Sequence, residues 1–448
     1  MSLMISVSGV RGIVGRTMTP QLTVDLGSAF AAHVQGGRVV LARDSRPSGP
    51  MLHAAVLSGL LSGGCEVIDL GIVTTPGAAI MVTESGADGG IVITASHNPL
   101  IWNGLKFLTR HGTAPPEDEA DDIFALYHSR GFTHVSAERI RGVTRDESTH
   151  RRHVDKVLAV MNAGAVAERG FHVVLDSVCG AGGAPGRMLL DALGCRVTHL
   201  NAEATGQFPH PPEPVAENLG DLCQAVTRAG ADVGFAQDPD ADRLAIVGET
   251  GRYLGEEYTL ALAARHVFAT RPGPAAANLS TSRMIDAVAD RAGADCVVHR
   301  SGVGEANVVE VMKQKASVLG GEGNGGVIDP RVVYVRDSLV AMALVLQLMA
   351  DEGTPLSRIV AQVPRYHMIK QKFECDRARI DAVLAAAKEE FAREKLNDAD
   401  GVRIDWPEGW VHVRGSNTEP IMRVIAEADD QAAAAELIGR VRRLIDRV

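Results

Sequence analysis

Over the first 365 residues, short apolar runs typical of buried strands alternate with longer segments that have the periodicity of helices. Short β-branched runs predict buried strands at residues 38–42, 65–70 and 91–93. A longer apolar periodicity predicts a helix over 22–33. A helix end, a glycine and a strand follow one another at 60–67, 190–197 and 289–297. Because these copies lie about 100 residues or more apart, they indicate repeated domains rather than short repeats. We therefore predict an α/β fold with three related αβ domains, each on a mainly parallel sheet.

The pattern changes after residue 365. A helix predicted over 377–395 precedes short strands near 402–405, 410–413 and 422–426, and an amphipathic helix starts at about 430. These elements predict a smaller C-terminal α+β domain with antiparallel strands. Taken together, the pattern places four domains at 1–150, 151–252, 253–365 and 366–448.

Composition narrows the functional classes. The 448-residue chain carries a net charge of −10, which argues against a nucleic-acid partner. Its six cysteines are scattered singly, so a zinc site or a disulfide framework is not expected. The N-terminus lacks a signal-peptide pattern, and the longest apolar run, near 339–350, is too short to cross a bilayer. We expect a cytoplasmic protein with no membrane partner.

The loop at 94–99 follows the predicted strand at 91–93 and ends in a proline. In an α/β protein, a small polar loop at the end of a strand is where ligands bind. Ser96 is the natural nucleophile of this loop, because its hydroxyl can accept and return a phosphoryl group. A simple serine-capped turn is the alternative.

Three carboxylates alternate between two apolar strands, at Asp238, Asp240 and Asp242. Pro239 disfavours a helix, and in a non-helical loop these side chains can converge on one point. Three oxygen ligands suit Mg²⁺, which keeps open positions for water or a phosphate oxygen. The alternative is a solvated acidic turn, but packed carboxylates repel one another unless a cation compensates them.

Two further loops have the composition of ligand sites. The glycine-rich segment 320–326 carries Glu322 and Asn324, which offer acceptors and an amide to the hydroxyls of a polyol. The segment 414–420, with Arg423 close behind, combines the arginine, hydroxyl, amide and turn N–H groups that phosphate recognition uses. A flexible loop and a polar hairpin, respectively, are the alternatives.

Two basic residues accompany the serine loop. Arg11 is presented by a glycine-flanked loop at 8–12. Lys106 follows Ser96 closely and would serve either as a proton shuttle or as a counter-charge for phosphate.

In order along the chain, the segments 94–99, 238–243, 321–326 and 414–420 resemble the signature loops of the α-D-phosphohexomutase superfamily, and 8–12 and 103–106 match too. The resemblance spans nearly the whole chain and is nearest to the archaeal-type phosphoglucosamine mutases. It implies that the four domains surround a central cleft. It also implies that Ser96 is carried as phosphoserine, with one Mg²⁺ per chain between its phosphate and Asp238, Asp240 and Asp242.

The resemblance implies a reaction as well. The phosphoserine gives its phosphoryl group to a hexose monophosphate, the resulting hexose bisphosphate turns end over end, and Ser96 takes back the other phosphoryl group. Arg11 and Lys106 are then the expected general acid and base. The expected substrate-binding residues are His97, Arg243, Glu322, Asn324, Arg414, Ser416, Asn417, Thr418 and Arg423.

The sequence departs from the family in two places. Positions 5–7 read Ile-Ser-Val where many members have Phe-Gly-Thr, and 324–326 read Asn-Gly-Gly where many bacterial members have Ser-Gly-His. The histidine role is therefore unassigned. Glucosamine phosphate is the first expected substrate, with mannose or glucose phosphate as the alternative. Outside the mutases, the alternatives are a sugar-phosphate phosphatase and a non-catalytic sugar-phosphate-binding regulator. Either a monomer or a homodimer is expected.

Overall fold

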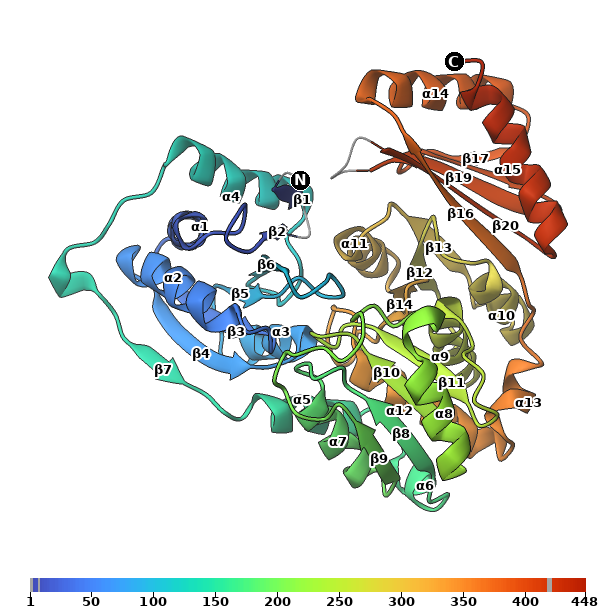
Figure 1. The fold of residues 1–448 in the computed structure, drawn as a ribbon, viewed down its shortest axis with the longest axis horizontal. Coiled ribbons are helices and arrows are strands. Elements are labelled where there is room, and N and C mark those ends of the chain that lie inside the picture. Colours follow the sequence, from blue (N-terminus) through green and yellow to red (C-terminus); the bar gives the residue numbers. More distant parts are fainter. Residues whose placement is uncertain (1–2, 7–8, 417–420) are drawn as a thin grey trace.

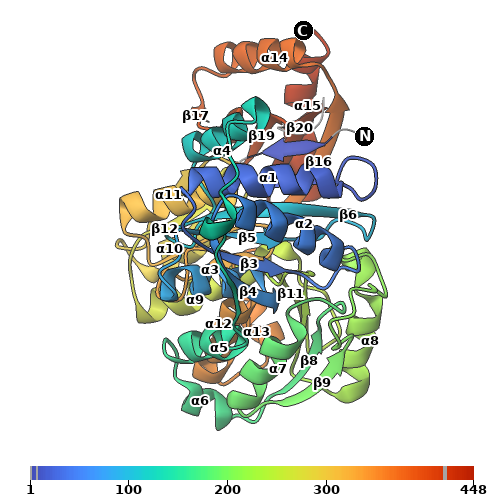
Figure 2. The same cartoon turned by 90° about the vertical axis from the view of Figure 1, so that its left-hand side faces the viewer.

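The computed structural model describes residues 3–6, 9–416 and 421–448, and within these residues the strands form four sheets (Figure 1). Three sheets lie in αβ units and the fourth in a C-terminal α+β unit. This agrees with the predicted fold class. Figure 2 shows the C-terminal unit at one end of the molecule and the second αβ unit at the other.

The first sheet has seven strands in the order β1-β2-β6-β5-β3-β4-β7. Their bounds are Met4–Ser6, Gly9–Ile13, Trp102–Thr109, Gly89–Ile93, Arg38–Arg43, Glu66–Ile72 and Val143–Arg145. Strands β5, β3, β4 and β7 pair in parallel, but β6, β2 and β1 add antiparallel pairs. This sheet is therefore mixed rather than mainly parallel, because β6 returns directly from the serine loop beside β5.

Helices cover both faces of the first sheet. Val39 and Leu41 of β3 join one hydrophobic cluster, while Val40 and Ala42 join another, as the alternation of a strand requires. Residues of α1 (Pro20–His33), α2 (Gly49–Ser62) and α4 (Glu117–Ser129) form the first cluster, and those of α3 (Thr75–Glu84) belong to the second.

The second and third sheets have the same arrangement of parallel and antiparallel strands. Their orders are β11-β10-β8-β9 and β13-β12-β14-β15, each with three parallel strands and one antiparallel edge strand. The strand bounds are His172–Asp176 (β8), Arg196–Leu200 (β9), Val233–Gln237 (β10), Leu244–Gly248 (β11), Ala275–Asn278 (β12), Val298–Ser301 (β13), Leu319–Glu322 (β14) and Gly326–Ile328 (β15). The glycines predicted to end helices have left-handed backbone at Gly64 (φ +84°) and Gly194 (φ +68°).

The helices of these units are α5 (Thr149–Leu158), α6 (Ala163–Ala167), α7 (Gly183–Ala192), α8 (Gly220–Ala229), α9 (Glu256–Thr270), α10 (Met284–Ala292), α11 (Glu305–Lys315), α12 (Ser338–Glu352) and α13 (Leu356–Val360). Short 3₁₀ turns occur at Ala137–Arg139 and Ala216–Asn218. The apolar run near 339–350 forms α12, which is buried along almost its entire length and packs against α9. Among the residues that the structure describes, every helix is too short or too polar to cross a membrane.

The C-terminal sheet is antiparallel throughout, in the order β16-β20-β19-β18-β17. Its strands are His367–Glu374, Ile421–Ala428, Gly409–Gly415, Val402–Trp406 and Lys395–Asn397, and α14 (Arg377–Glu390) and α15 (Gln431–Ile445) complete the unit. The helix predicted to reach residue 395 ends at Glu390. Phe391 packs edge-on against Trp406, with the ring centroids 5.5 Å apart, and the chain then enters β17.

Candidate active site

Ser96 lies just beyond β5, fully buried, with a left-handed backbone (φ +49°). This conformation is strained for a non-glycine residue, and such strain concentrates at functional sites. The Ser96 amide donates to Thr94 Oγ1 (2.9 Å), and the Ser96 hydroxyl donates to Asp238 Oδ2 (2.6 Å). The loop therefore presents the hydroxyl directly to the acidic cluster.

Arg46 holds the serine loop in this shape. Its guanidinium, which is fully buried, donates to the carbonyl oxygens of Ser96 (2.6 Å), Asn98 (2.7 Å), Pro99 (3.0 Å) and Trp102 (3.1 Å). It also pairs with Asp44 at 3.1 Å. Arg46 was not among the residues predicted for the site. Its signal was the polar turn at 43–48, directly after a buried strand.

The carboxylates of Asp238, Asp240 and Asp242 lie together between β10 and β11, with one oxygen of each within 4.8 Å of the others. All three are buried. Ala241 has a left-handed backbone (φ +57°), which turns the loop between the second and third carboxylates. Asp240 Oδ1 and Asp242 Oδ1 are buried without a hydrogen-bond partner. Because a buried carboxylate oxygen without a partner is costly, this arrangement fits a divalent cation with oxygen ligands.

The charges in the cluster are unequally compensated. Burial raises the pKa of Asp238 well above its usual value, and the charges of Asp242 and Asp240 raise it further. Burial also favours a higher pKa for Asp242. The positive charges of Arg336, Lys106 and Arg243 outweigh it and lower the pKa of Asp242 well below the usual value. A bound cation would relieve the repulsion between the carboxylates.

Lys106 extends from β6 into the acidic cluster. Its ammonium lies 2.6 Å from Asp240 Oδ2 and 2.9 Å from Asp242 Oδ2. Burial favours the neutral amine, but the charges of Asp240 and Asp242 outweigh it and raise the pKa of Lys106.

Arg11 lies on β2, opposite Gly104 of β6, and donates to Asn98 Oδ1 (3.0 Å). Burial lowers the pKa of Arg11, and the charge of Arg243 lowers it further. Its environment therefore differs from that of Lys106, although the sequence placed both residues in the same role.

His97 faces the cavity beside the serine. Its Nδ1 lies 3.4 Å from Ser96 Oγ, and its Nε2 lies 3.9 Å from Glu213. The charge of Arg243 and burial lower the pKa of His97 well below its usual value, so the ring is neutral. Arg243 follows directly after the third carboxylate, and its Nε lies 3.8 Å from Asp242.

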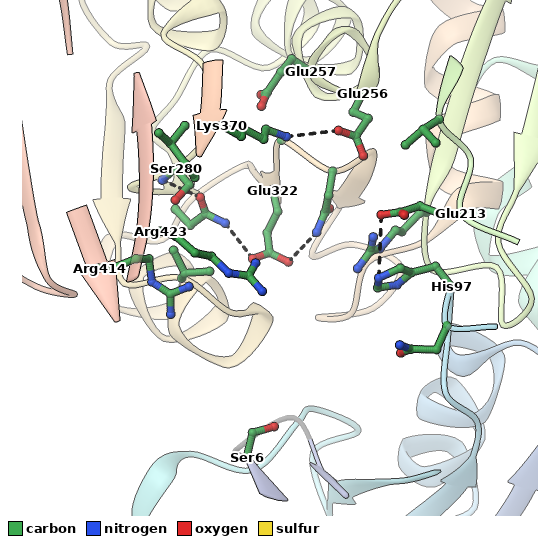
Figure 3. Close-up of a pocket in the computed structure, with 18 of the residues that line it drawn as sticks. Ser6, His97, Glu213, Glu256, Glu257, Ser280, Glu322, Lys370, Arg414 and Arg423 are labelled. Atoms are coloured by element: carbon green, nitrogen blue, oxygen red, sulfur yellow. Dashed lines mark hydrogen bonds and ion pairs between the residues drawn. The ribbon is translucent and has the colours of Figure 1, made fainter. Parts of the chain in front are cut away.

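Glu322 is the last residue of β14, and its side chain lies in the pocket (Figure 3). Its carboxylate accepts from Asn278 Nδ2 (2.7 Å), from the Gly304 amide (3.2 Å) and from Arg336 (2.5 Å). Burial would raise the pKa of Glu322, but Arg336 and Asn278 lower it. The carboxylate is therefore ionised and held from several sides.

Asn324 also lines the cavity, and its Oδ1 accepts from the Gly326 amide at 3.2 Å. A Cβ on Gly326 would lie 2.2 Å from Arg336 Cδ. Gly326, the position at which a histidine was expected from many bacterial members of the family, therefore leaves room for the stem of an arginine.

Arg414 and Arg423 stand opposite each other on β19 and β20 and point into the same cavity (Figure 3). Arg414 Nε donates to Asp400 Oδ2 at 3.0 Å. Ser416 follows β19, and its amide donates to the Ile421 carbonyl. Asn417 and Thr418 lie outside the described residues, so their predicted contacts stay predictions.

These groups surround one cavity of about 740 Å³. Arg11 and His97 reach it from the first unit, Arg243 from the second, Glu322 from the third and Arg414 from the C-terminal unit. Ser96 and the three aspartates lie buried beside it rather than in its lining. The described residues of the four segments singled out in the sequence thus lie at or beside one cavity.

Comparisons with known proteins identify the family of the chain. Domains I, II and III of the family described as phosphoglucomutase/phosphomannomutase, alpha/beta/alpha, match residues 3–134, 151–251 and 256–366, and its C-terminal domain matches 368–444. The chain belongs to this family. It is a phosphohexomutase, an isomerase that moves a phosphoryl group within a hexose phosphate.

Family members with curated names and solved structures are similar over the whole chain. A "Probable phosphoglucosamine mutase" from Methanopyrus kandleri is 35% identical, with 98% of each chain covered. A "Phosphoglucomutase/phosphomannomutase" from Thermococcus kodakarensis is 37% identical, covering 98% of this chain and 97% of the relative. The crystal structure of a phosphoglucomutase/phosphomannomutase family protein from Burkholderia thailandensis matches with a TM-score of 0.87 at 28% identity, covering 99% of this chain and 98% of that one. The superfamily inferred from the sequence is thereby confirmed.

Proposed function

We propose that the chain interconverts glucosamine 6-phosphate and glucosamine 1-phosphate, with Ser96 as the phosphoryl carrier and a glucosamine bisphosphate as the intermediate. The observation that carries the proposal is the 2.6 Å hydrogen bond from Ser96 Oγ to Asp238, within a cluster whose two other carboxylates each keep an oxygen that accepts no hydrogen bond. A nucleophile beside a cation site is the arrangement that phosphoryl transfer needs.

Asp238, Asp240 and Asp242 would hold one Mg²⁺ together with the phosphate on Ser96. When bound, Mg²⁺ supplies positive charge that stabilises the transferring phosphoryl group. A phosphoserine carries nearly two negative charges, and Lys106 and Arg243 lie where they can compensate them. These side chains align and neutralise the phosphoryl group, which is most of what this chemistry demands.

The transfer exchanges one P–O bond for another. A free hydroxyl of the bound sugar phosphate attacks the phosphorus, the bond to Ser96 Oγ breaks, and the serine leaves as a hydroxyl after taking up a proton. We assign the proton exchange with the sugar hydroxyl to Arg11, because it lines the cavity whereas Lys106 does not, and because burial lowers its pKa. Lys106, whose pKa is raised, is assigned the role of counter-charge. After the bisphosphate has turned, the same steps run in reverse.

The two ends of the substrate meet different groups. Glu322 and Asn324 are assigned to the sugar hydroxyls, and His97 lies beside the reacting end. The phosphate that does not react is assigned to Arg414, Ser416, Asn417, Thr418 and Arg423.

An amino sugar fits the charges of the cavity. Besides the arginines and Lys370, the cavity is lined by the carboxylates of Glu213, Glu256 and Glu322. Glucosamine phosphate carries both an ammonium group and a phosphate, so it complements both sets of charges, whereas glucose or mannose phosphate complements only the arginines. The names of several relatives support the same substrate.

Coupled assays with the 6-phosphates and 1-phosphates of glucosamine, glucose and mannose test the proposal. We expect the highest kcat/KM for glucosamine phosphate. A higher value for glucose or mannose phosphate would instead support the second candidate, a phosphoglucomutase/phosphomannomutase, which the Thermococcus kodakarensis relative favours. Release of free phosphate measured in the same reactions distinguishes a mutase from a phosphatase.

A further inference from the structure

Arg336 lies between β15 and α12 and is almost completely buried. Each nitrogen of its guanidinium contacts a different carboxylate. Nη1 donates to Glu322 Oε2 (2.5 Å), Nη2 to Asp242 Oδ2 (2.7 Å) and Nε to Glu305 Oε2 (3.1 Å). One planar cation thus joins the loop of the third sheet to the acidic loop of the second.

The side chain does not line the cavity, although Glu322 does. Its stem passes over Gly326, where a Cβ would lie 2.2 Å from Arg336 Cδ. Its backbone amide also donates to Glu305 Oε2 (2.9 Å). The guanidinium is therefore fixed from behind and acts on the cavity only through the carboxylates that it holds.

The contact decides how Asp242 is presented. Asp242 Oδ2 accepts from Arg336 and Lys106, so Oδ1 is the oxygen left without a hydrogen bond, with Arg243 Nε 3.8 Å away. Glu322 is oriented in a similar way, since Arg336 binds Oε2 while Asn278 and the Gly304 amide bind Oε1.

We propose that Arg336 is a positioning residue that couples the sugar-binding carboxylate of Glu322 to the metal-binding carboxylate of Asp242. The inference rests on the proposed function of both carboxylates. Because the two share one cation, a change at Glu322 alters how strongly Arg336 holds Asp242. Sugar contacts and cation affinity are then linked through a single side chain.

A double-mutant cycle on cation binding tests the coupling without requiring turnover. Mn²⁺ affinity is measured by electron paramagnetic resonance on the full chain in wild type, Glu322→Gln, Arg336→Met and the double variant. Neutralising Glu322 leaves Arg336 to bind Asp242 more strongly. We therefore expect Glu322→Gln to weaken Mn²⁺ binding about threefold or more when Arg336 is present and to have little effect in the Arg336→Met background.

Equal effects of Glu322→Gln in both backgrounds would overturn the proposal while leaving the metal site in place. If wild type binds no Mn²⁺, the proposed metal site fails and the coupling fails with it. Should Arg336→Met not fold, Arg336→Lys provides the same cycle, because a lysine ammonium lacks the rigid planar fork through which Arg336 holds its three carboxylates in fixed directions. Arg331→Met is the matched control, since Arg331 lies in the same segment but pairs with Asp329. In that background the full effect of Glu322→Gln should persist.

Discussion

Ser96 Oγ and Asp238 Oδ2 lie 2.6 Å apart, although 142 residues separate them in the sequence. The contact joins the first sheet to the second and places a hydroxyl next to three clustered carboxylates.

Replacing the serine should stop the reaction. For Ser96→Ala we expect kcat to fall by at least about 10³-fold, because the group that accepts the phosphoryl is removed. Coupled assays give the rate, and circular dichroism checks the fold. Intact mass after incubation with hexose bisphosphate should show one added phosphate in wild type and none in the variant. Ser45→Ala is the control. Ser45 donates to the Cys179 carbonyl, which also accepts from Gly206, so activity should be kept.

Cation removal should inactivate the enzyme reversibly. We expect EDTA to abolish turnover and Mg²⁺ to restore it. Added Mg²⁺ should also raise the thermal midpoint, since a ligand present at 100 times its Kd stabilises the folded state by about 2.7 kcal/mol. Asp240→Asn should lose this shift and lower the activity more than about 100-fold. Mutating even a residue that only hydrogen-bonds to a metal ligand typically lowers metal affinity or activity about 10- to 100-fold. The exposed Asp295, changed to Asn, should behave like wild type.

Arg46 should matter for stability as well as for activity. Arg46→Met leaves the buried Asp44 without its ion pair and removes donors from the serine loop, which should cost about 3–5 kcal/mol. The loss should appear as a lower midpoint of denaturant unfolding. A double variant that also carries Asp44→Asn should recover part of it. No recovery would show that the loop carbonyls, rather than the ion pair, account for the loss.

Stability should depend on pH through Glu257. Burial raises the pKa of this carboxyl to about 8, and Glu427 adds to the shift while Lys370 opposes it. In the folded chain the group therefore stays protonated up to about pH 8, whereas in the unfolded chain it ionises near its usual value of 4.5. Between these values the folded state binds more protons, so stability falls as pH rises, by at most about 1.4 kcal/mol per pH unit. Glu257→Gln should flatten this slope in denaturation curves. Glu310→Gln, on the surface helix α11, should not.

Glu213 should contribute to substrate choice. Its carboxylate lines the cavity and attracts an ammonium group, which glucose phosphate lacks. We expect Glu213→Gln to reduce the preference for glucosamine over glucose phosphate by about fivefold, which is the scale of one partly screened ion pair. The ratio of the two kcat/KM values measures the effect. An unchanged ratio would assign amino-group recognition to another carboxylate.

The local patterns of the sequence determined much of this protein. Strand runs that end in small polar loops identified Ser96, and alternate carboxylates around Pro239 identified the acidic cluster, because both signals depend only on neighbouring residues. The pattern of apolar and polar positions likewise indicated three αβ units and a different C-terminal unit. The residue-level assignments of roles remain predictions that the variants above will test.

Tertiary structure decided which distant side chains serve these loops. Arg336 contacts Asp242 across 94 residues, and Arg46 contacts the Ser96 carbonyl across 50, so no local pattern connects either pair. The mixed first sheet and the early end of α14 at Glu390 were also set by packing, through β6 beside β5 and Phe391 against Trp406. A sequence specifies the side chains that are available for a site. Which of them form buried ion pairs with one another depends on how the separate sheets pack together.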